Sequence, residues 1–116
     1  MSDTRAAGFA AETLALTHLR RCGLALIERN FHCRMGEIDL IMRDGETLVF
    51  VEVRLRARGS FASAAESIDV HKQRRIAAAA RFYLAGRPEC ACRFDCVVLD
   101  RPSADAVEWI RSAFEA

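Results

Sequence analysis

A β-hairpin pattern between residues 36 and 54 constrains the fold of this chain more than any other feature. Two runs rich in Ile, Leu, Val and Phe flank the dipeptide Asp44-Gly45, and such a dipeptide between β-rich runs strongly indicates a two-residue turn. With Asp44 and Gly45 as the loop, Arg43 pairs with Glu46. The pattern therefore predicts two antiparallel strands in that register.

Acidic residues alternate along this expected hairpin. In the same register Asp39 faces Phe50 and Glu37 faces Glu52. Because side chains alternate along a strand, Asp39 and Glu52 share a face as diagonal neighbours, roughly 7–8 Å apart at the backbone, and Arg54 lies on that face too. Converging carboxylates repel each other unless a proton or a cation lies between them, and Mg²⁺ needs only one or two carboxylates besides water and phosphate oxygens. The spacing alone leaves two interpretations open: a metal site, or a half-exposed sheet face with solvated acids and a Glu–Arg pair.

Residues 4–22 have the pattern of an amphipathic helix. Asp3 or Thr4 can cap its start, and Gly23 marks its end. Glu12 falls inside the apolar sector, where it is unexpected because an unpaired buried charge costs several kcal/mol. At about 100° per residue, the apolar residues of that sector are Ala7, Phe9, Ala11, Leu14, Ala15, Leu16 and Leu19.

A second helix is expected over residues 70–85. Asp69 can cap its start, and Gly86 follows its end. Gln73 lies in the middle of the apolar sector of this helix, and Lys72 lies at the edge of that sector. A polar residue in the middle of an apolar face either satisfies a backbone group in the core or belongs to a site.

The remaining elements complete the expected fold. Strands are predicted at 26–33 and 93–99, residues 56–67 are predicted to form a loop, and the tail at 107–114 forms either a short strand or a helical turn. Asp95 is expected to cap or pair within the sheet. The order α-β-β-β-α-β predicts an α/β fold, or an α+β sandwich, with a mixed sheet flanked by helices. The 116 residues fit a single domain, 1–116.

Composition excludes some classes of protein and leaves others open. Hydrophobic residues make up 52% of the chain, which is enough for a core, and the formal net charge of +1 argues neither for nor against an anionic partner. No uncharged run approaches the roughly 20 residues of a membrane span, and the N-terminal sequence lacks the pattern of a signal peptide. Five cysteines without a framework spacing fit reduced thiols. We therefore expect a cytoplasmic protein with no membrane partner.

Four short motifs resemble those of a known family. They are Gly-Glu-Ile-Asp-Leu-Ile at 36–41, Phe-Val-Glu-Val-Arg at 50–54, Lys-Gln-Arg at 72–74 and Arg-Phe-Asp at 93–95. Their order and spacing resemble the YraN family of uncharacterised bacterial proteins over essentially the whole chain. That family is similar to the PD-(D/E)xK nuclease superfamily, whose restriction-endonuclease-like fold is shared with archaeal Holliday junction resolvases.

The resemblance implies a role for several residues. Asp39 takes the place of the motif Asp, Glu52 that of the following Asp or Glu, and Arg54 that of the usual Lys. Glu12 matches a glutamate that many of these nucleases add to the metal site, so Glu12, Asp39 and Glu52 are the implied ligands of Mg²⁺ or Mn²⁺. Gln73 lies where the second helix points toward the cleft. The implied catalytic residues are Asp39, Glu52, Arg54 and Gln73.

Arg54 departs from the superfamily pattern. Lys can orient a water molecule and share a proton, whereas Arg stays charged and cannot act as a base, although it can still stabilise a phosphate. The implied function is a metal-dependent endonuclease acting on branched or structured DNA. The alternative is a nucleic-acid-binding module that has lost cleavage, and a third, weaker interpretation is a scaffold that contacts a protein. Resolvase relatives act as dimers, so a homodimer is expected by analogy.

Basic residues near the expected cleft predict contacts with phosphates. They lie in the segment that follows the second hairpin strand and in the first turns of the second helix. Arg binds phosphate in a planar, bidentate way, although such runs also occur on solvated faces. The predicted nucleic-acid-binding residues are Arg56, Arg58, Lys72, Arg74 and Arg75.

Overall fold

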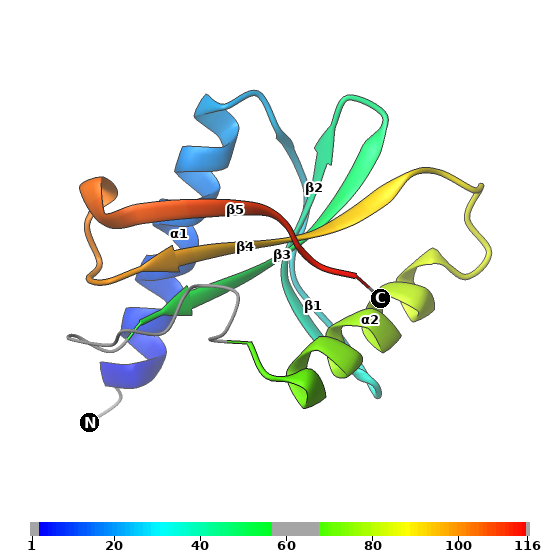
Figure 1. Cartoon of the computed structure of the whole chain (residues 1–116), viewed down its shortest axis with the longest axis horizontal. Helices are drawn as coiled ribbons and strands as arrows, with labels where there is room; N and C mark the ends of the chain where they lie inside the picture. The colour runs from blue at the N-terminus through cyan, green and yellow to red at the C-terminus, as the bar shows by residue number, and fades with distance from the viewer. Residues whose placement is uncertain (1–2, 57–67, 116) are drawn as a thin grey trace.

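The computed structural model describes residues 3–56 and 68–115, apart from the side chains of residues 3–5. Its elements follow one another as helix, three strands, helix and two strands (Figure 1). They are α1 (Asp3–Arg21), β1 (Ala25–Cys33), β2 (Gly36–Asp44), β3 (Thr47–Leu55), α2 (Val70–Leu84), β4 (Cys92–Leu99), a short 3₁₀ turn (Ala104–Ala106) and β5 (Val107–Phe114). Neither α1 nor α2, within these described ranges, is long and apolar enough to cross a membrane.

The five strands form one mixed sheet in the order β1-β2-β3-β4-β5. Three neighbouring pairs are antiparallel, whereas β3 and β4 are parallel and are joined by the crossover through α2. The prediction of an α/β fold with a mixed sheet and flanking helices is confirmed. The tail at 107–114, for which a strand and a helical turn were both open, is the edge strand β5.

The sheet has a hydrophobic core on each face, and each helix covers one of them (Figure 1). Ala15 and Leu19 of α1 pack on one face against Val51 of β3, whereas Ile76 of α2 packs on the other face against Phe50 of β3. Successive residues of β3 thus enter opposite cores. This explains why β3 is a nearly continuous apolar run, as strands buried on both faces are.

The register of the β2–β3 hairpin differs from the prediction. Asp44 pairs with Thr47, so the two-residue loop is Gly45-Glu46, and the expected pairing of Arg43 with Glu46 is wrong. Gly45 has a φ of 62°, and a type II′ hairpin turn requires a residue with positive φ at its first central position. Gly45 therefore belongs at that first position, which shifts every cross-strand partner by two residues.

Both helices begin and end close to the expected residues. α1 ends at Arg21, before Gly23, and α2 begins after Asp69, whose Oδ1 accepts the backbone N–H of Lys72 at 2.8 Å. Phe9 differs from the prediction, because its side chain is 59% exposed rather than part of the apolar face. The Arg29 guanidinium lies over the Phe9 ring, 4.1 Å from its centroid.

Asp95 is fully buried in β4 and satisfies its charge within the sheet, as expected. Its carboxylate accepts the indole N–H of Trp109 at 2.9 Å and the backbone N–H of Ser112 at 2.9 Å, both from β5. The Arg93 Nε lies 3.0 Å from the same carboxylate. These hydrogen bonds link β5 to β4. Asp95 is therefore a structural residue of the sheet and is not a candidate for the site.

Candidate functional site

The candidate site begins where the ladder between β2 and β3 ends. The last paired residues are Leu40 and Val51, and the next pair in this register is Asp39 and Glu52. The backbone N–H of Val53 donates to Oδ2 of Asp39 at 2.8 Å. Sequence analysis expected Asp39 and Glu52 on a diagonal, and the two-residue shift of the hairpin puts them opposite each other instead.

The carboxyl groups of Asp39 and Glu52 interact directly. Two ionised carboxylates this close repel each other, so a proton or a cation between them stabilises the pair. The Glu52 side chain is only 4% exposed. Burial, reinforced by the negative charge of Asp39 and opposed by Lys72, raises the pKa of Glu52 to about 8. Burial also raises the pKa of Asp39, against the Val53 hydrogen bond, which lowers it.

Two cations face the same oxygen of Glu52. The Lys72 Nζ, from the first turn of α2, lies 3.5 Å from Oε2 of Glu52, and Nη1 of Arg54 lies 3.8 Å from it. The Asp69 cap fixes the first turn of α2 and thereby the base of the Lys72 side chain. The site thus combines a buried acid pair with two positive charges.

These groups line a cavity of about 310 Å³. Its walls come from α1, β2, β3 and α2, so four separate segments of the chain meet here. The structure brings together five of the residues singled out in the sequence, and their roles stay predictions. The lining residues are Gly8, Ala11, Glu12, Asp39, Glu52, Val53, Arg54, Leu55 and Lys72.

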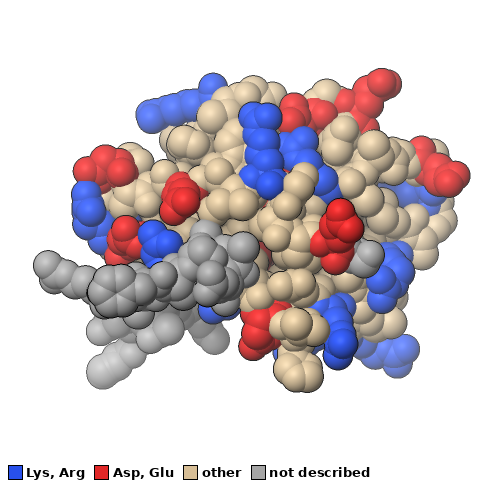
Figure 2. Space-filling model, viewed as in Figure 1, with Lys and Arg blue, Asp and Glu red and all other residues tan. Residues whose placement is uncertain are grey.

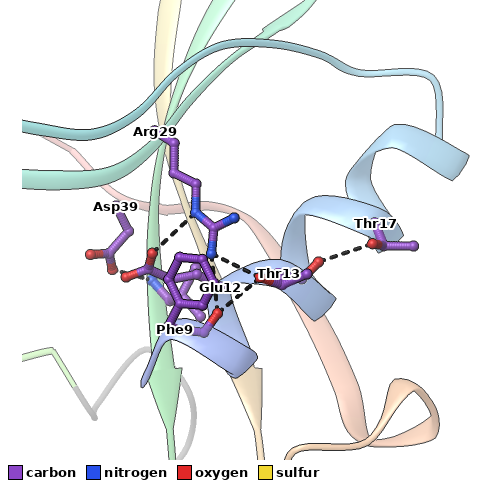
Figure 3. Close-up of polar contacts among 7 residues, drawn as sticks. Phe9, Glu12, Thr13, Thr17, Arg29 and Asp39 are labelled. Atoms are coloured by element: carbon purple, nitrogen blue, oxygen red, sulfur yellow. Dashed lines mark hydrogen bonds and ion pairs between the residues drawn. The ribbon is translucent and has the colours of Figure 1, made fainter. Parts of the chain in front are cut away.

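Glu12 enters this cavity from α1, and its carboxylate lies between the Arg29 guanidinium and the Asp39 carboxylate (Figure 3). The Arg29 Nε is 3.4 Å from Oε1 of Glu12, and the side chain of Asn30 also hydrogen-bonds to Glu12. Burial and then the charge of Asp39 raise the pKa of Glu12, whereas the Asn30 and Arg29 contacts lower it. The unexpected acid in the apolar sector of α1 therefore has partners.

A family model covers most of this chain. The model described as "Uncharacterised protein family UPF0102" matches residues 11–99, a span that includes Glu12, Asp39, Glu52 and Lys72. The chain belongs to the UPF0102 family. This confirms the resemblance to the YraN-like family.

Relatives in the UPF0102 family match over almost their full length. A UPF0102 protein of Dechloromonas aromatica is 55% identical over 113 residues, which cover 97% of this chain and 92% of the relative. One from Stutzerimonas stutzeri is 48% identical over 120 residues, covering both chains completely. One from Nitrosospira multiformis is 52% identical over 112 residues, covering 96% of this chain and 94% of the relative.

The Asp39–Glu52 pair could act as two ligands of a hard divalent cation. Within residues 3–56 and 68–115, no group of three or more His, Cys, Asp or Glu side chains is arranged to hold a metal ion. Mg²⁺, however, is commonly held by one or two carboxylates together with water and phosphate oxygens. The Asp39–Glu52 pair supplies two carboxylates that need a positive charge or a proton between them, and Glu12 lies beside Asp39.

The structure does not bring Gln73 to the carboxylates. The Gln73 side-chain amide donates to the backbone oxygen of Ile68 at 2.9 Å, which is the alternative that sequence analysis left open for it. Gln73 lines a different cavity of about 310 Å³, shared with Arg74, Arg81 and Glu115. The polar residue inside the apolar sector thus satisfies the backbone just before α2.

The predicted nucleic-acid contacts lie in different surroundings. Arg56 is engaged in ion pairs, with its Nε 2.8 Å from Asp100 and its Nη2 3.6 Å from Glu108. Arg74 and Arg75 are exposed on α2, and Arg58 lies outside the described residues. On the face seen in Figure 2, basic and acidic side chains are interspersed and form no single basic patch.

Sequence reasoning missed Arg29 and Asn30. Both lie in a strand pattern, and nothing in their spacing marks them as partners of α1. The one available indication was Glu12 itself, because a carboxylate on an apolar helix face needs a cation or donors from the neighbouring element. The structure supplies both from β1.

Proposed function

We propose that this UPF0102 protein is a metal-dependent endonuclease that hydrolyses phosphodiester bonds in branched or structured DNA, with Mg²⁺ or Mn²⁺ as cofactor. The observation that supports this most is the buried Asp39–Glu52 pair, which faces Lys72 and Arg54 across one cavity. Acids that bind a cation and cations that bind a phosphate are the two charge types that phosphoryl transfer needs. The resemblance of the motifs to the PD-(D/E)xK nucleases points the same way.

Each residue has a defined task in this proposal. Asp39 and Glu52 would hold the ion, with Glu12 beside them, and the ion would supply an activated water and neutralise charge on the phosphate. The Val53 N–H fixes the orientation of Asp39. Lys72 and Arg54 stabilise the negative charge that builds up on the phosphate oxygens, which Arg can do in a bidentate way.

The DNA partner is proposed from the chemistry of the cavity and its surroundings. Lys72 belongs to the same helix as the exposed Arg74 and Arg75, so a phosphate backbone that enters the cavity can continue along α2. A four-way junction has two-fold symmetry, and a homodimer of this chain would match it. We therefore propose junctions before plain duplexes as substrates.

A nucleic-acid-binding module without cleavage is the second candidate. Arg54 occupies the position at which the nuclease motif has Lys, and an always-charged guanidinium cannot take a proton from water. The two candidates differ at this residue. In an enzyme, Arg54→Lys retains or increases cleavage and Arg54→Ala lowers it by about ten- to a thousandfold, whereas in a binding module neither the protein nor Arg54→Lys cuts any substrate.

The deciding experiment is single-turnover cleavage of labelled junction, flap, single-stranded and duplex DNA with Mg²⁺ or Mn²⁺. We expect cleavage of branched DNA that is lost in Asp39→Asn and Glu52→Gln. Asp105→Asn removes a carboxylate from an exposed ion pair with Arg101, and this matched control should cut like the unaltered protein. Cleavage that persists in Glu52→Gln points to a contaminating nuclease and contradicts the proposal.

Calorimetric titration with Mn²⁺ tests the cofactor separately. The unaltered protein should bind the ion, and Asp39→Asn and Glu52→Gln should abolish binding, because each removes one of two carboxylates. Equal affinity in all three proteins contradicts a metal site at this pair.

A further inference from the structure

Arg29 is fixed to α1 by four separate contacts (Figure 3). Its Nη2 donates to the backbone oxygen of Phe9 at 3.1 Å and to Oγ1 of Thr13 at 2.9 Å, and its guanidinium stacks on the Phe9 ring. Its Nε then faces Oε1 of Glu12 at 3.4 Å. The contacts with Phe9 and Thr13 fix the position of the guanidinium without Glu12. The guanidinium can therefore fix the position of the Glu12 carboxylate.

A local reversal of β1 turns Arg29 toward α1. Arg29 and Phe31 are two residues apart and would share a face in a regular strand. Instead, Arg29 contacts α1, whereas Phe31 packs against Tyr83 of α2, with ring centroids 5.3 Å apart. Asn30, between them, has a φ of 57°, a left-handed conformation that Asn adopts more readily than most residues. The reversal therefore occurs at Asn30.

The neighbouring strand reverses at the same level. Ile38 of β2 lies in the core under α2, whereas Leu40 lies in the core under α1. Leu40 pairs with Arg29 and Ile38 with Phe31, so Asp39 lies opposite Asn30. The reversal in β1 that brings Arg29 and Asn30 to Glu12 therefore lies opposite Asp39, the first residue of the acid pair.

Two donors from this bend meet on one carboxylate. The Arg29 Nε and the Asn30 side chain both bond to Glu12, whose side chain is 16% exposed. A carboxylate held by two donors on a rigid strand keeps one orientation, whereas a free glutamate has three rotatable bonds. The orientation that results points at Asp39 (Figure 3).

We propose that Arg29 and Asn30 are positioning residues that hold the Glu12 carboxylate beside Asp39, where its negative charge supports binding of a divalent cation by the Asp39–Glu52 pair. This inference rests on the proposed function and adds a role for two residues of β1. Groups that orient a metal ligand commonly matter 10–100-fold for metal affinity. Arg29 and Asn30 act through Glu12 and touch neither substrate nor metal.

The test measures Mn²⁺ affinity by calorimetry in single and double variants. Arg29→Met removes the charged donors and keeps an unbranched apolar side chain. Asn30→Gly removes the amide and keeps the positive φ, because glycine tolerates it without strain. We expect each to weaken binding by roughly tenfold, and Arg29→Lys to restore part of the loss. Arg101→Met, which removes an exposed cation far along the chain, is the matched control and should bind normally.

The decisive comparison repeats Arg29→Met and Asn30→Gly in a Glu12→Gln background. If the two residues act through Glu12, neither change weakens binding further there. An equal additional loss in that background, or unchanged affinity of both single variants, overturns the inference while the metal site stands. Absence of Mn²⁺ binding by the unaltered protein overturns the inference together with the proposed cofactor. Asn30→Gly keeps the test valid if Arg29→Met does not fold.

Discussion

The Lys72 ammonium lies closer to the Glu52 carboxylate than the Arg54 guanidinium does, at 3.5 Å against 3.8 Å from Oε2. Lys72 is the only lysine of the chain, and it reaches the acid pair from α2, whereas Arg54 belongs to β3. Lys72 also lowers the pKa of both Asp39 and Glu52, whereas Arg54 lowers that of Glu52. The main counter-charge of the pair therefore comes from the helix.

The first prediction follows from that placement. Lys72→Met should lower the single-turnover cleavage rate at saturating DNA by about a hundred- to a thousandfold, the range for loss of one preorganised electrostatic group. Arg81→Met, which removes an exposed cation from the same helix, should leave the rate within a factor of two or so. A loss in Lys72→Met that disappears at higher DNA concentration would show a contribution to binding only, contrary to this prediction.

The second prediction concerns stability and pH in metal-free buffer. The pKa of Glu52 is about 8 in the folded protein and near 4.5 in an unfolded chain, so between these values the folded state holds a proton that the unfolded state has released. The free energy of unfolding therefore falls as pH rises. The stabilisation is fully present below about pH 4.5 and is lost as pH rises through about 8, by up to about 1.4 kcal/mol per pH unit.

Urea unfolding at several values between pH 5 and pH 8, with a chelator present, measures this dependence. Glu52→Gln cannot ionise, so it should flatten the slope and be more stable than the unaltered protein at pH 8. Asp105→Asn, which alters an exposed carboxylate, should keep the original slope. The prediction is wrong if Glu52→Gln unfolds with the same pH dependence as the unaltered protein.

The third prediction concerns the salt dependence of DNA binding. Replacing Arg74 and Arg75 together with Ala should flatten the log–log slope by up to roughly two units, because each phosphate contact contributes about 0.9. A matched removal of two exposed arginines from the end of α1, Arg20 and Arg21, should change the slope less. Fluorescence anisotropy with a junction, without divalent metal, gives both slopes. Identical slopes for the two double variants would exclude α2 as the phosphate-binding face.

Sequence patterns predicted the elements of this fold better than their exact pairing. Apolar periodicity located both helices and the capping residue Asp69 located the start of α2, because these are local properties, whereas Asp3 and Thr4, expected as caps, lie inside α1. The hairpin register failed by two residues, because Asp44-Gly45 and Gly45-Glu46 both place glycine in the turn and only the observed backbone selects between them. A shift of two residues leaves each side chain on the same face of the sheet. The prediction that Asp39 and Glu52 lie close together on one face therefore did not depend on the exact register.

The surroundings of the acids were less accessible to sequence reasoning. The resemblance to a nuclease motif led to Glu12, but its partners Arg29 and Asn30 depend on a reversal in β1. A strand pattern assumes regular alternation and cannot show where it reverses. For Gln73, the position in the apolar sector of α2 was predicted. Its hydrogen-bond partner, the backbone oxygen of Ile68, could not be predicted from that position.

The last prediction concerns Gly36, at the start of β2. A Cβ atom at this position would lie 3.1 Å from the backbone oxygen of Arg75 and 3.3 Å from its Cβ, so a side chain there would be crowded and α2 would have to move slightly away from β2. Gly36→Ala should destabilise the protein by about 1–3 kcal/mol, as overpacking commonly does. Because α2 carries Lys72, a helix displaced to relieve the contact should also lengthen the Lys72–Glu52 distance and slow cleavage.

Gly8→Ala is the contrasting control, because a Cβ there meets nothing within 4 Å and alanine favours the helix by up to about 1 kcal/mol. Thermal unfolding of the two variants should therefore shift in opposite directions, and a Gly36→Ala protein as stable as the unaltered one would contradict the close approach.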